Sequence, residues 1–317
     1  MKRMAPRYMR DFKCIAGDCR HSCCIGWEID IDEESLENYR RVEGEFGKRL
    51  AENISLDGES ACFRLDKDER CPFLNECGLC DIYTELGEES LCQICTEHPR
   101  FYNEIAGRLE VGVGLCCEAA AKLVLCQEDP FLLDVLEDAG EEEDPFFLDV
   151  LEDDGKEEVY DRIEDEILHA RRLYIGNVQT GASLAYFMPD RIFKKDWCAF
   201  FSSLERLDPK WSEELSKWKN APVGAWEEPM ECFDRQFRNL ICYFLYRHFP
   251  SADGVIGSVA RMYFAFLSYR VVRVLCVLRE NCTLEDLLDI ARMYSAEIEY
   301  SEENTERILE ELEACLQ

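Results

Sequence analysis

The spacing of apolar residues changes along the chain, from short irregular segments in the first part to helical periodicity in the second. From about residue 160 onward, apolar side chains recur every three to four positions, as on one face of a helix. We expect a helix from near Pro229 to Phe249, a long helix over Val255 to Glu280, and a helix capped by Thr283. A last amphipathic helix follows Ser301 and runs through Leu316.

The first part of the chain predicts short strands and loops around one early helix. Alternating residues from Cys24 to Ile31 predict a strand, and Asp32 is a suitable cap for a helix through Leu50. Residues 102–105 and 109–113 flank Ala106-Gly107, which predicts a β-hairpin. Residues 118–125 predict a short helix.

These elements predict a mainly α fold, in which a small cysteine-rich α+β metal-binding domain precedes an all-helical C-terminal domain. We place the first domain at residues 1–127 and the second at residues 159–317. Strands do not alternate with helices, so a doubly wound nucleotide-binding fold is not supported.

The connector between the two domains, residues 128–158, is acidic and duplicated. The 15 residues from Asp129 to Glu143 are nearly repeated from Asp144 to Glu158. One short copy is too small to be a repeat unit of a solenoid, so a tandem duplication within a tolerant linker is the simpler explanation. We therefore expect a solvated connector.

One glycine-containing segment offers two interpretations. Leu109-Glu-Val-Gly-Val-Gly-Leu-Cys116 resembles the turn with which Rossmann-type methyltransferases hold S-adenosylmethionine. However, Cys116 stands where the third glycine belongs, and no β/α repeats follow. The hairpin accounts for the same two glycines.

The formal net charge of −31 restricts the class of partner. Nucleic acid and anionic lipid both require basic residues to neutralise phosphate, so we exclude both as partners held by charge. Cationic groups, including the side chains of substrate lysines, are attracted instead. No secretory signal follows Met1, and arginines interrupt the apolar stretch after Val255, so we expect a cytoplasmic protein without a transmembrane segment.

In a reducing compartment, disulfides are rare and cysteines point to metal ligation or free thiols. Thirteen of the 19 cysteines lie before residue 127. Four of them form the series Cys14-x4-Cys19-x3-Cys23-Cys24, and thiolates at this density favour zinc or an iron–sulfur cluster. Adjacent Cys23 and Cys24 either sit at a turn or serve different partners, because neighbours in a strand point to opposite faces.

A second set of cysteines follows in closely spaced pairs. Cys71 precedes Cys77-x2-Cys80, which resembles a zinc-knuckle turn, and Cys92-x2-Cys95 and Cys116-Cys117 come later. Zinc therefore remains a candidate metal beside an iron–sulfur cluster. The interspersed His21 and His98 are further candidate ligands, whereas six later cysteines are scattered singly and are expected to be buried free thiols. These six are Cys198, Cys232, Cys242, Cys276, Cys282 and Cys315.

Taken together, these motifs resemble the flagellin lysine N-methylase family, which is itself similar to small zinc- or iron-chelating cysteine domains. The helical remainder, including Tyr294-Ser-Ala-Glu-Ile-Glu-Tyr300, looks like the C-terminal part of that family. The segments that carry the resemblance are Cys14-x4-Cys19-x3-Cys23-Cys24-Ile-Gly-Trp27, Cys71-Pro-Phe-Leu, Gly78-Leu-Cys80-Asp-Ile, Cys95-x3-Pro99-Arg100 and Leu115-Cys116-x-Glu118-Ala-Ala.

The resemblance implies S-adenosylmethionine as methyl donor, a [4Fe–4S] cluster, and lysine side chains of flagellin as acceptor. The matching metal ligands are Cys14, Cys19, Cys23, Cys24, Cys71, Cys80, Cys95 and Cys116. Eight thiols exceed the four of one cluster, so a second centre, with zinc as a candidate, is conceivable. The chain departs from the pattern by adding Cys77, Cys92 and Cys117, and by carrying His98 in place of a tyrosine.

Neither a catalytic base nor a donor-binding residue is assigned by the resemblance. The competing hypothesis is a non-catalytic zinc- or iron-binding scaffold or carrier module. A pocket large enough for the methyl donor would favour the enzyme, and a closed metal centre without one would favour the scaffold.

Overall fold

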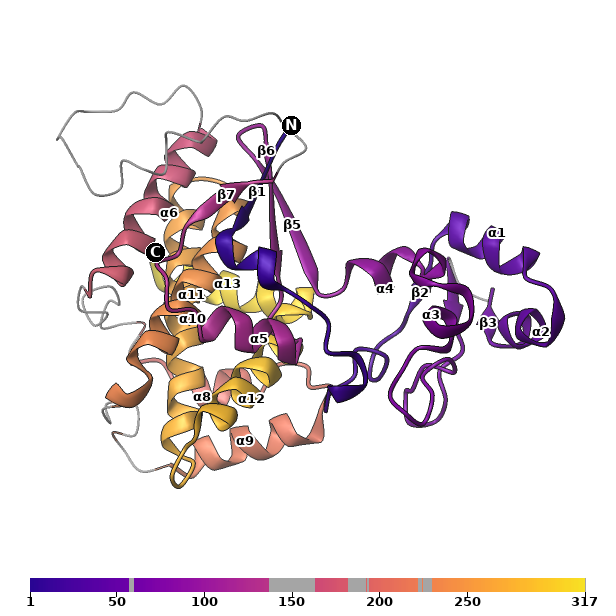
Figure 1. The fold of residues 1–317 in the computed structure, drawn as a ribbon. Helices are drawn as coiled ribbons and strands as arrows, with labels where there is room; N and C mark the ends of the chain where they lie inside the picture. Colours follow the sequence, from indigo (N-terminus) through magenta and orange to yellow (C-terminus); the bar gives the residue numbers. More distant parts are fainter. Residues whose placement is uncertain are drawn as a thin grey trace. The chain divides into compact units, whose positions relative to one another are not determined.

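The computed structural model divides the chain into two compact units, which we treat separately (Figure 1). The cysteine unit comprises Lys13–Arg100 and Cys117–Ala119, and the helical unit comprises Met1–Phe12, Phe101–Cys116 and Ala120–Gln317. The structure describes residues 1–56, 60–136, 163–181, 192, 194–221, 224 and 230–316. The predicted mainly α class is confirmed, and the predicted domain boundaries at residues 127 and 158 stay a prediction.

A four-stranded sheet of order β5-β6-β1-β7 belongs to the helical unit, apart from the first residue of β5. Its strands are β1 (Lys2–Pro6), β5 (Arg100–Ile105), β6 (Arg108–Val113) and β7 (Leu133–Val135). β1 runs parallel to β6 and antiparallel to β7. The predicted hairpin is confirmed: Ala106 and Gly107 both adopt positive φ, as the tight turn between two twisted strands requires.

The start of the predicted connector takes part in this sheet. Leu133 is buried, and Met4 pairs with Val135 in the antiparallel register. Phe131 packs against the same small apolar cluster as Leu133. The rest of the acidic duplication, from residue 137, lies outside the described residues.

Helices make up most of the helical unit, and several match the predicted ones closely. Thr283 caps α12 with a reciprocal capping box to Asp286, and the short helix at residues 118–125 is confirmed as α5. Their bounds are α5 (Glu118–Leu125), α6 (Ile163–Gln179), α8 (Trp197–Phe201), α9 (Pro209–Lys219), α10 (Asp234–His248), α11 (Val255–Val277), α12 (Leu284–Tyr294) and α13 (Glu302–Leu316). Short 3-10 turns span Arg7–Asp11, Glu231–Phe233 and Phe249–Ser251, and a π-helical turn spans Ser295–Glu299.

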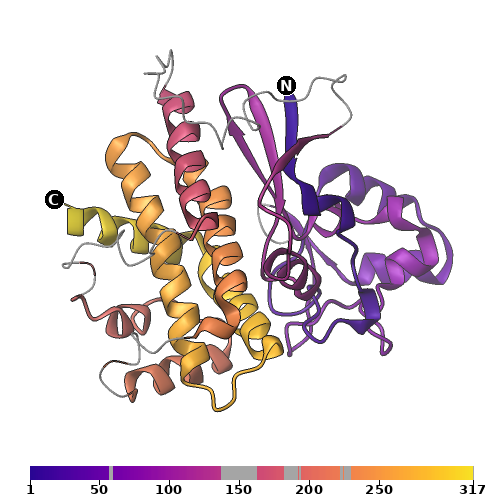
Figure 2. The same cartoon turned by 60° about the vertical axis from the view of Figure 1, so that its left-hand side comes forward.

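The long apolar helix α11 is the centre of this unit. Its length and its mean hydropathy of 1.3 would suffice to cross a membrane, but 56% of that apolar window is buried within the protein. α10, α12 and α13 all pack against it, and α10 lies beside it in Figure 2. Such burial is typical of a core helix in a globular protein.

Helices α6 and α10 also form hydrogen bonds to the sheet of the helical unit. The guanidinium of Arg171 on α6 makes two 2.6 Å hydrogen bonds to the carboxylate of Glu110 on β6. The hydroxyl of Tyr246 on α10 donates to the carbonyl of Val111, one residue further along β6. The same strand is thereby held from two helices.

The cysteine unit combines a three-stranded sheet of order β2-β4-β3 with short helices around an aromatic core. Tyr39, Phe63 and Phe73 lie in this core, with ring centroids 5.1 Å apart for the two phenylalanines. The elements are β2 (Asp30–Ile31), β3 (Ile54–Ser55), β4 (Ala61–Phe63), α1 (Glu33–Arg41), α2 (Gly44–Glu52), α3 (Asp81–Leu86) and α4 (Gln93–Glu97), with 3-10 turns at Ala16–Asp18 and Glu88–Ser90.

Two local predictions for this unit differ from the structure. The strand predicted from Cys24 is confined to Asp30–Ile31, because Gly26 adopts a φ of +92° and turns the chain away from an extended path. Asp32 caps a helix as predicted, accepting a hydrogen bond from the Ser35 amide. That helix ends at Arg41, however, and a second begins at Gly44, whose φ of +80° breaks the helical backbone.

Candidate metal centre

Seven of the eight predicted ligand cysteines lie in the cysteine unit, and the eighth, Cys116, belongs to the helical unit. Within the cysteine unit, the thiols form two groups. The members of each group lie close enough to one another for their charges to interact. We call them the loop group, consisting of Cys14, Cys19, Cys23 and Cys117, and the core group, consisting of Cys24, Cys71, Cys80, Cys92 and Cys95.

Gly17, which lies between Cys14 and Cys19 of the loop group, stands where two glycine-containing loops approach each other. A Cβ on Gly17 would lie 2.8 Å from the carbonyl oxygen of Cys77, closer than real side chains tolerate. Gly78 adopts a φ of +73°, and a Cβ there would lie 3.4 Å from the Cα of Gly17. Glycine at both positions therefore allows the two backbones to touch.

Glu118 ties the loop group to the start of α5. The Cys19 thiol donates to its carboxylate over 3.1 Å, and the Arg20 backbone amide and guanidinium donate over 2.6 and 2.8 Å. Burial alone would raise the pKa of Glu118, but these hydrogen bonds lower the pKa to about 2. The contact brings Cys117 to thiols almost a hundred residues earlier in the chain.

The core group lies in the apolar interior of the cysteine unit, next to Tyr39 and Ile82. Cys71 and Cys92 are buried, and burial together with the charges of neighbouring thiols raises the pKa of Cys71 to about 12. Cys80 and Cys92 directly precede α3 and α4 and occupy the N-cap positions of these two helices. Several thiolates in one apolar region repel each other, and a bound cation would relieve that repulsion.

Cys23 and Cys24 connect the two groups. The Cys23 thiol donates a hydrogen bond to Cys24, which raises the pKa of Cys23 and lowers that of Cys24 to about 7. Cys23 also interacts with Cys14 and Cys117, whereas Cys24 interacts with Cys71 and Cys80 of the core group. The adjacent thiols lie at a turn of the backbone and have different further neighbours, so both arrangements that the sequence allowed occur together.

Two cysteines that the predicted ligand set omits belong to these groups. Cys92 pairs with Cys95 through a thiol hydrogen bond, and Cys117 interacts with Cys19 and Cys23. Both stand in pairs that the sequence displays, at Cys92-x2-Cys95 and Cys116-Cys117. The signal was present, but the family pattern did not single these positions out.

The two histidines near the cysteines have other contacts. His98 stacks against Trp27 with ring centroids 5.4 Å apart, and burial lowers the pKa of His98 to about 4, so its imidazole is neutral near pH 7. The Nδ1 atom of His21 lies 3.3 Å from the Glu118 carboxylate. Of the six later cysteines, Cys242 and Cys276 are buried as predicted, whereas Cys232 is exposed and the other three are partly buried. Cys276 and Cys282 share a thiol hydrogen bond at the end of α11, although they are scattered singly in the sequence.

The donor chemistry fits a soft metal, since every residue in the two groups offers sulfur. Among the described residues, no three Cys, His, Asp or Glu side chains converge to the spacing of a single metal ion. The ligand assignment therefore stays a prediction, with the loop group and the core group as the two places where thiols gather.

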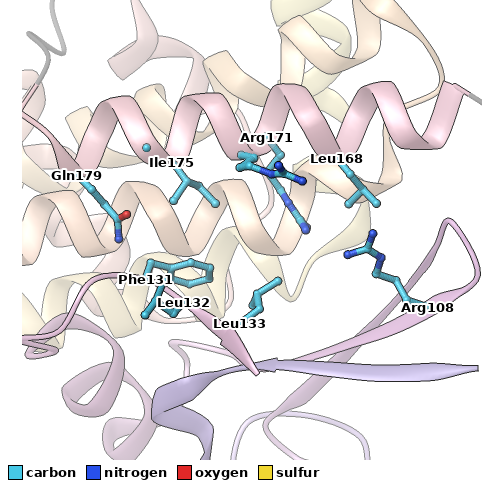
Figure 3. Close-up of a pocket in the computed structure, with 10 residues that line it drawn as sticks. Arg108, Phe131, Leu132, Leu133, Leu168, Arg171, Ile175 and Gln179 are labelled. Atoms are coloured by element: carbon cyan, nitrogen blue, oxygen red, sulfur yellow. The ribbon is translucent and has the colours of Figure 1, made fainter. Parts of the chain in front are cut away.

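A small cavity lies in the helical unit between α6 and the strands β6 and β7 (Figure 3). Arg108, Phe131, Leu133, Arg171, Ile175 and Gln179 line it. Its volume of about 40 Å³ is far below the roughly 300–1,000 Å³ of sites for drug-sized ligands. None of the predicted metal ligands lies among its lining residues, so we assign it no part in donor binding.

The glycines of the candidate donor-binding turn have a structural explanation. A Cβ on Gly112 would lie 2.2 Å from the ring of Phe101 on β5, and one on Gly114 would lie 2.3 Å from the Tyr300 hydroxyl. Both glycines are therefore required by side chains that press on β6 and the residue after it. The hairpin interpretation is supported over a nucleotide-binding turn.

Comparison with known proteins agrees with the helical part of the chain. Residues 132–316 match the family model of the FliB lysine N-methylase C-terminal domain. Lysine-N-methylases of Salmonella choleraesuis and Salmonella typhimurium are each 26% identical over 137 residues, which cover 40% of this chain and 33% of each relative. The flagellar biosynthetic protein FliU of Salmonella muenchen is 24% identical over 134 residues, 40% of this chain and 79% of that protein.

The match to the two lysine-N-methylases thus spans about a third of their length. No solved structure matches the chain. The family model covers more than half of the 317 residues and includes the helices from α6 to α13. The chain therefore belongs to the FliB lysine N-methylase family.

Proposed function

We propose that this protein transfers methyl groups from S-adenosylmethionine to lysine ε-amines of flagellin, in a reaction that depends on a cysteine-ligated [4Fe–4S] cluster. Membership of the lysine N-methylase family carries the reaction class. The two groups of thiols support the metal, and the name of the FliU relative supports a flagellar protein as acceptor. We further propose that the reaction takes place in the cytoplasm.

The metal ligands of this proposal come from the matched cysteine set and from the thiols beside it. Thiolates would hold an iron–sulfur cluster through four cysteines. The loop group and the core group each contain enough sulfur for one centre, so the two groups are the candidate sites for a cluster and a second centre such as zinc. A bound cluster would supply a centre that binds the donor, shapes the site or exchanges electrons.

The acceptor must be a neutral amine for polar methyl transfer. The lysine ε-ammonium loses its proton, the nitrogen lone pair forms the new N–C bond, and the donor's S–C bond breaks with its electrons on sulfur. The net charge of −31 draws cationic lysines to the protein. Fixing the amine in line with the methyl group would supply much of the rate, since positioning alone can lower a barrier by several kcal/mol, on the order of 7–11.

The experiment compares two cysteine variants with wild-type protein that has been reconstituted anaerobically with iron and sulfide. Each is incubated with S-adenosylmethionine and flagellin, and the flagellin is then weighed by mass spectrometry. Cys23→Ser removes a thiol that interacts with both groups, and Cys232→Ser removes an exposed thiol of the helical unit. We expect methyl additions on lysine with wild type and Cys232→Ser, and none with Cys23→Ser.

The same measurement separates the enzyme from the alternative, a non-catalytic zinc- or iron-binding scaffold or carrier. If protein that contains metal neither binds the donor nor alters flagellin, the scaffold hypothesis replaces the proposed activity.

A further inference from the structure

A fully buried carboxylate, Glu299, organises a polar network inside the helical unit. It is the last residue of the π-helical turn Ser295–Glu299, and its side chain has no exposed surface. The Tyr243 hydroxyl donates to it over 3.1 Å, and Nε2 of His248 lies 2.7 Å from its Oε1. Nε of Arg247 lies 3.4 Å from the same oxygen. A π-helical turn is an uncommon backbone feature that often marks a functional position.

The charges of this network compensate each other within the core. Burial alone would raise the pKa of Glu299, but the positive charge of Arg247 and the hydrogen bond from His248 lower the pKa below its ordinary value. Glu299 is thus an anion held by a hydroxyl, an imidazole and a guanidinium. It is suited to holding neighbouring groups in place, and not to removing a proton from a substrate.

The network reaches the three residues after β6. The Tyr243 hydroxyl accepts hydrogen bonds from the Leu115 amide, over 3.3 Å, and from Nη1 of Arg247, over 2.8 Å. The hydroxyl of Tyr300 forms a hydrogen bond with the Cys116 thiol. Gly114 has no side chain, which leaves room for the Tyr300 hydroxyl and the Arg247 guanidinium directly above it.

Arg247 also fixes the ring of Tyr300. Its guanidinium carbon lies 4.9 Å from the ring centroids of both Phe101 and Tyr300, so the cation is sandwiched between two aromatic faces. Since Glu299 holds Arg247, the orientation of the Tyr300 hydroxyl depends on a carboxylate that does not itself touch the thiol.

We infer that Glu299, Arg247 and Tyr300 are positioning residues for the Cys116 sulfur, which they hold in place as a metal ligand. Groups that hydrogen-bond a ligand atom orient it and change its affinity for the metal. The inference rests on the proposed function, because it assumes that Cys116 is a ligand.

The test uses Tyr300→Phe, which removes the hydroxyl and keeps the ring that stacks on Arg247. Tyr300 is 41% exposed, so the substitution leaves the core packing in place. The matched control is Tyr246→Phe. It removes a buried hydroxyl that donates to the Val111 carbonyl in β6, several residues before Cys116. Both variants are first compared with wild type by circular dichroism and thermal unfolding.

Two readouts then report on Cys116. In reconstituted protein, iron content, iron release to a chelator and the visible absorption spectrum are measured, and we expect Tyr300→Phe to lower metal affinity about 10–100-fold. In metal-free protein, alkylation of each cysteine by iodoacetamide is followed by peptide mass spectrometry. We expect Cys116 to react faster in Tyr300→Phe, relative to Cys126 as an internal reference, and to be unchanged in Tyr246→Phe.

The outcomes are distinguishable. If wild type holds no metal, the proposed cluster fails and the assignment of Cys116 as a ligand fails with it. If wild type holds metal but Tyr300→Phe matches Tyr246→Phe in both readouts, the positioning inference alone is overturned. Glu299→Gln should act in the same direction as Tyr300→Phe, and an unchanged absorption spectrum in a folded Glu299→Gln protein would also contradict the inference.

Discussion

Replacing Arg171 by methionine should destabilise the helical unit strongly, because it leaves a charge alone in the core. Glu110 has no exposed side-chain surface, and Arg171 supplies two hydrogen bonds of 2.6 Å to its carboxylate. Arg171 also stacks on Tyr246 with its guanidinium carbon 5.2 Å from the ring centroid. Breaking a buried ion pair by removing one partner costs about 3–5 kcal/mol.

That cost converts into a measurable shift in melting temperature. For a unit of this size, each kcal/mol corresponds to about 2–4 °C, so Arg171→Met should melt roughly 6–20 °C below wild type. Circular dichroism during heating, and unfolding in urea, provide the two measurements. The variant perturbs the packing of α6 against β6, since the Arg171–Glu110 ion pair joins these two elements.

The double variant Glu110→Met/Arg171→Met tests the physical reason. An apolar pair of similar volume removes the unpaired charge, so we expect the double variant to recover most of the lost stability. A single variant that loses less than about 1 kcal/mol, or a double variant no more stable than the single one, would refute the reasoning that an unpaired buried carboxylate is the cause.

Three further predictions concern other parts of the chain. Thr283→Ala removes the capping box of α12 and should cost about 1 kcal/mol in urea unfolding. Hydrogen bonds from Thr283 lower the pKa of Asp286 to about 2, so the stability it contributes is present above its unfolded pKa and is lost as the pH falls towards 2. Gly17→Ala would press a methyl group against the Cys77 carbonyl and should lower metal content. Deletion of residues 144–158 should change the melting temperature little, because loop length enters chain entropy only logarithmically.

Each of these predictions has a contrary result. Equal acid sensitivity of wild type and Thr283→Ala below pH 4 would exclude the cap as the source of that pH dependence. Normal metal content in Gly17→Ala would show that the two glycine loops need not touch. A large fall in melting temperature on deletion would mean that the second copy packs as the first copy does at Phe131 and Leu133.

The helical half was largely predictable from the sequence, because local signals determine it. Apolar residues at helical spacing mark α11 and α13, and Thr283 with an acidic residue three positions later marks a helix start. The hairpin at Ala106-Gly107 was predictable for the same reason. In each case the decisive information lies within a few neighbouring residues.

The thiol groups and the buried network were not predictable in this way, because distant residues create them. Nothing near Gly17 shows that the backbone of Cys77 lies against it. Glu299 looks like an ordinary acidic residue in sequence, and the approach of Arg247 and His248 from α10 makes its burial tolerable. The strand predicted from Cys24 failed for a local reason, since alternation alone does not reveal the turn at Gly26.

The central claim is that the cysteines hold an iron–sulfur cluster, and elemental analysis after anaerobic purification tests it most directly. Iron, acid-labile sulfide and zinc are quantified per polypeptide, together with the absorption spectrum. We expect about four iron atoms and four sulfides for each chain, with broad visible absorption. Zinc without sulfide, or protein without metal when purified from iron-replete cells, would contradict it.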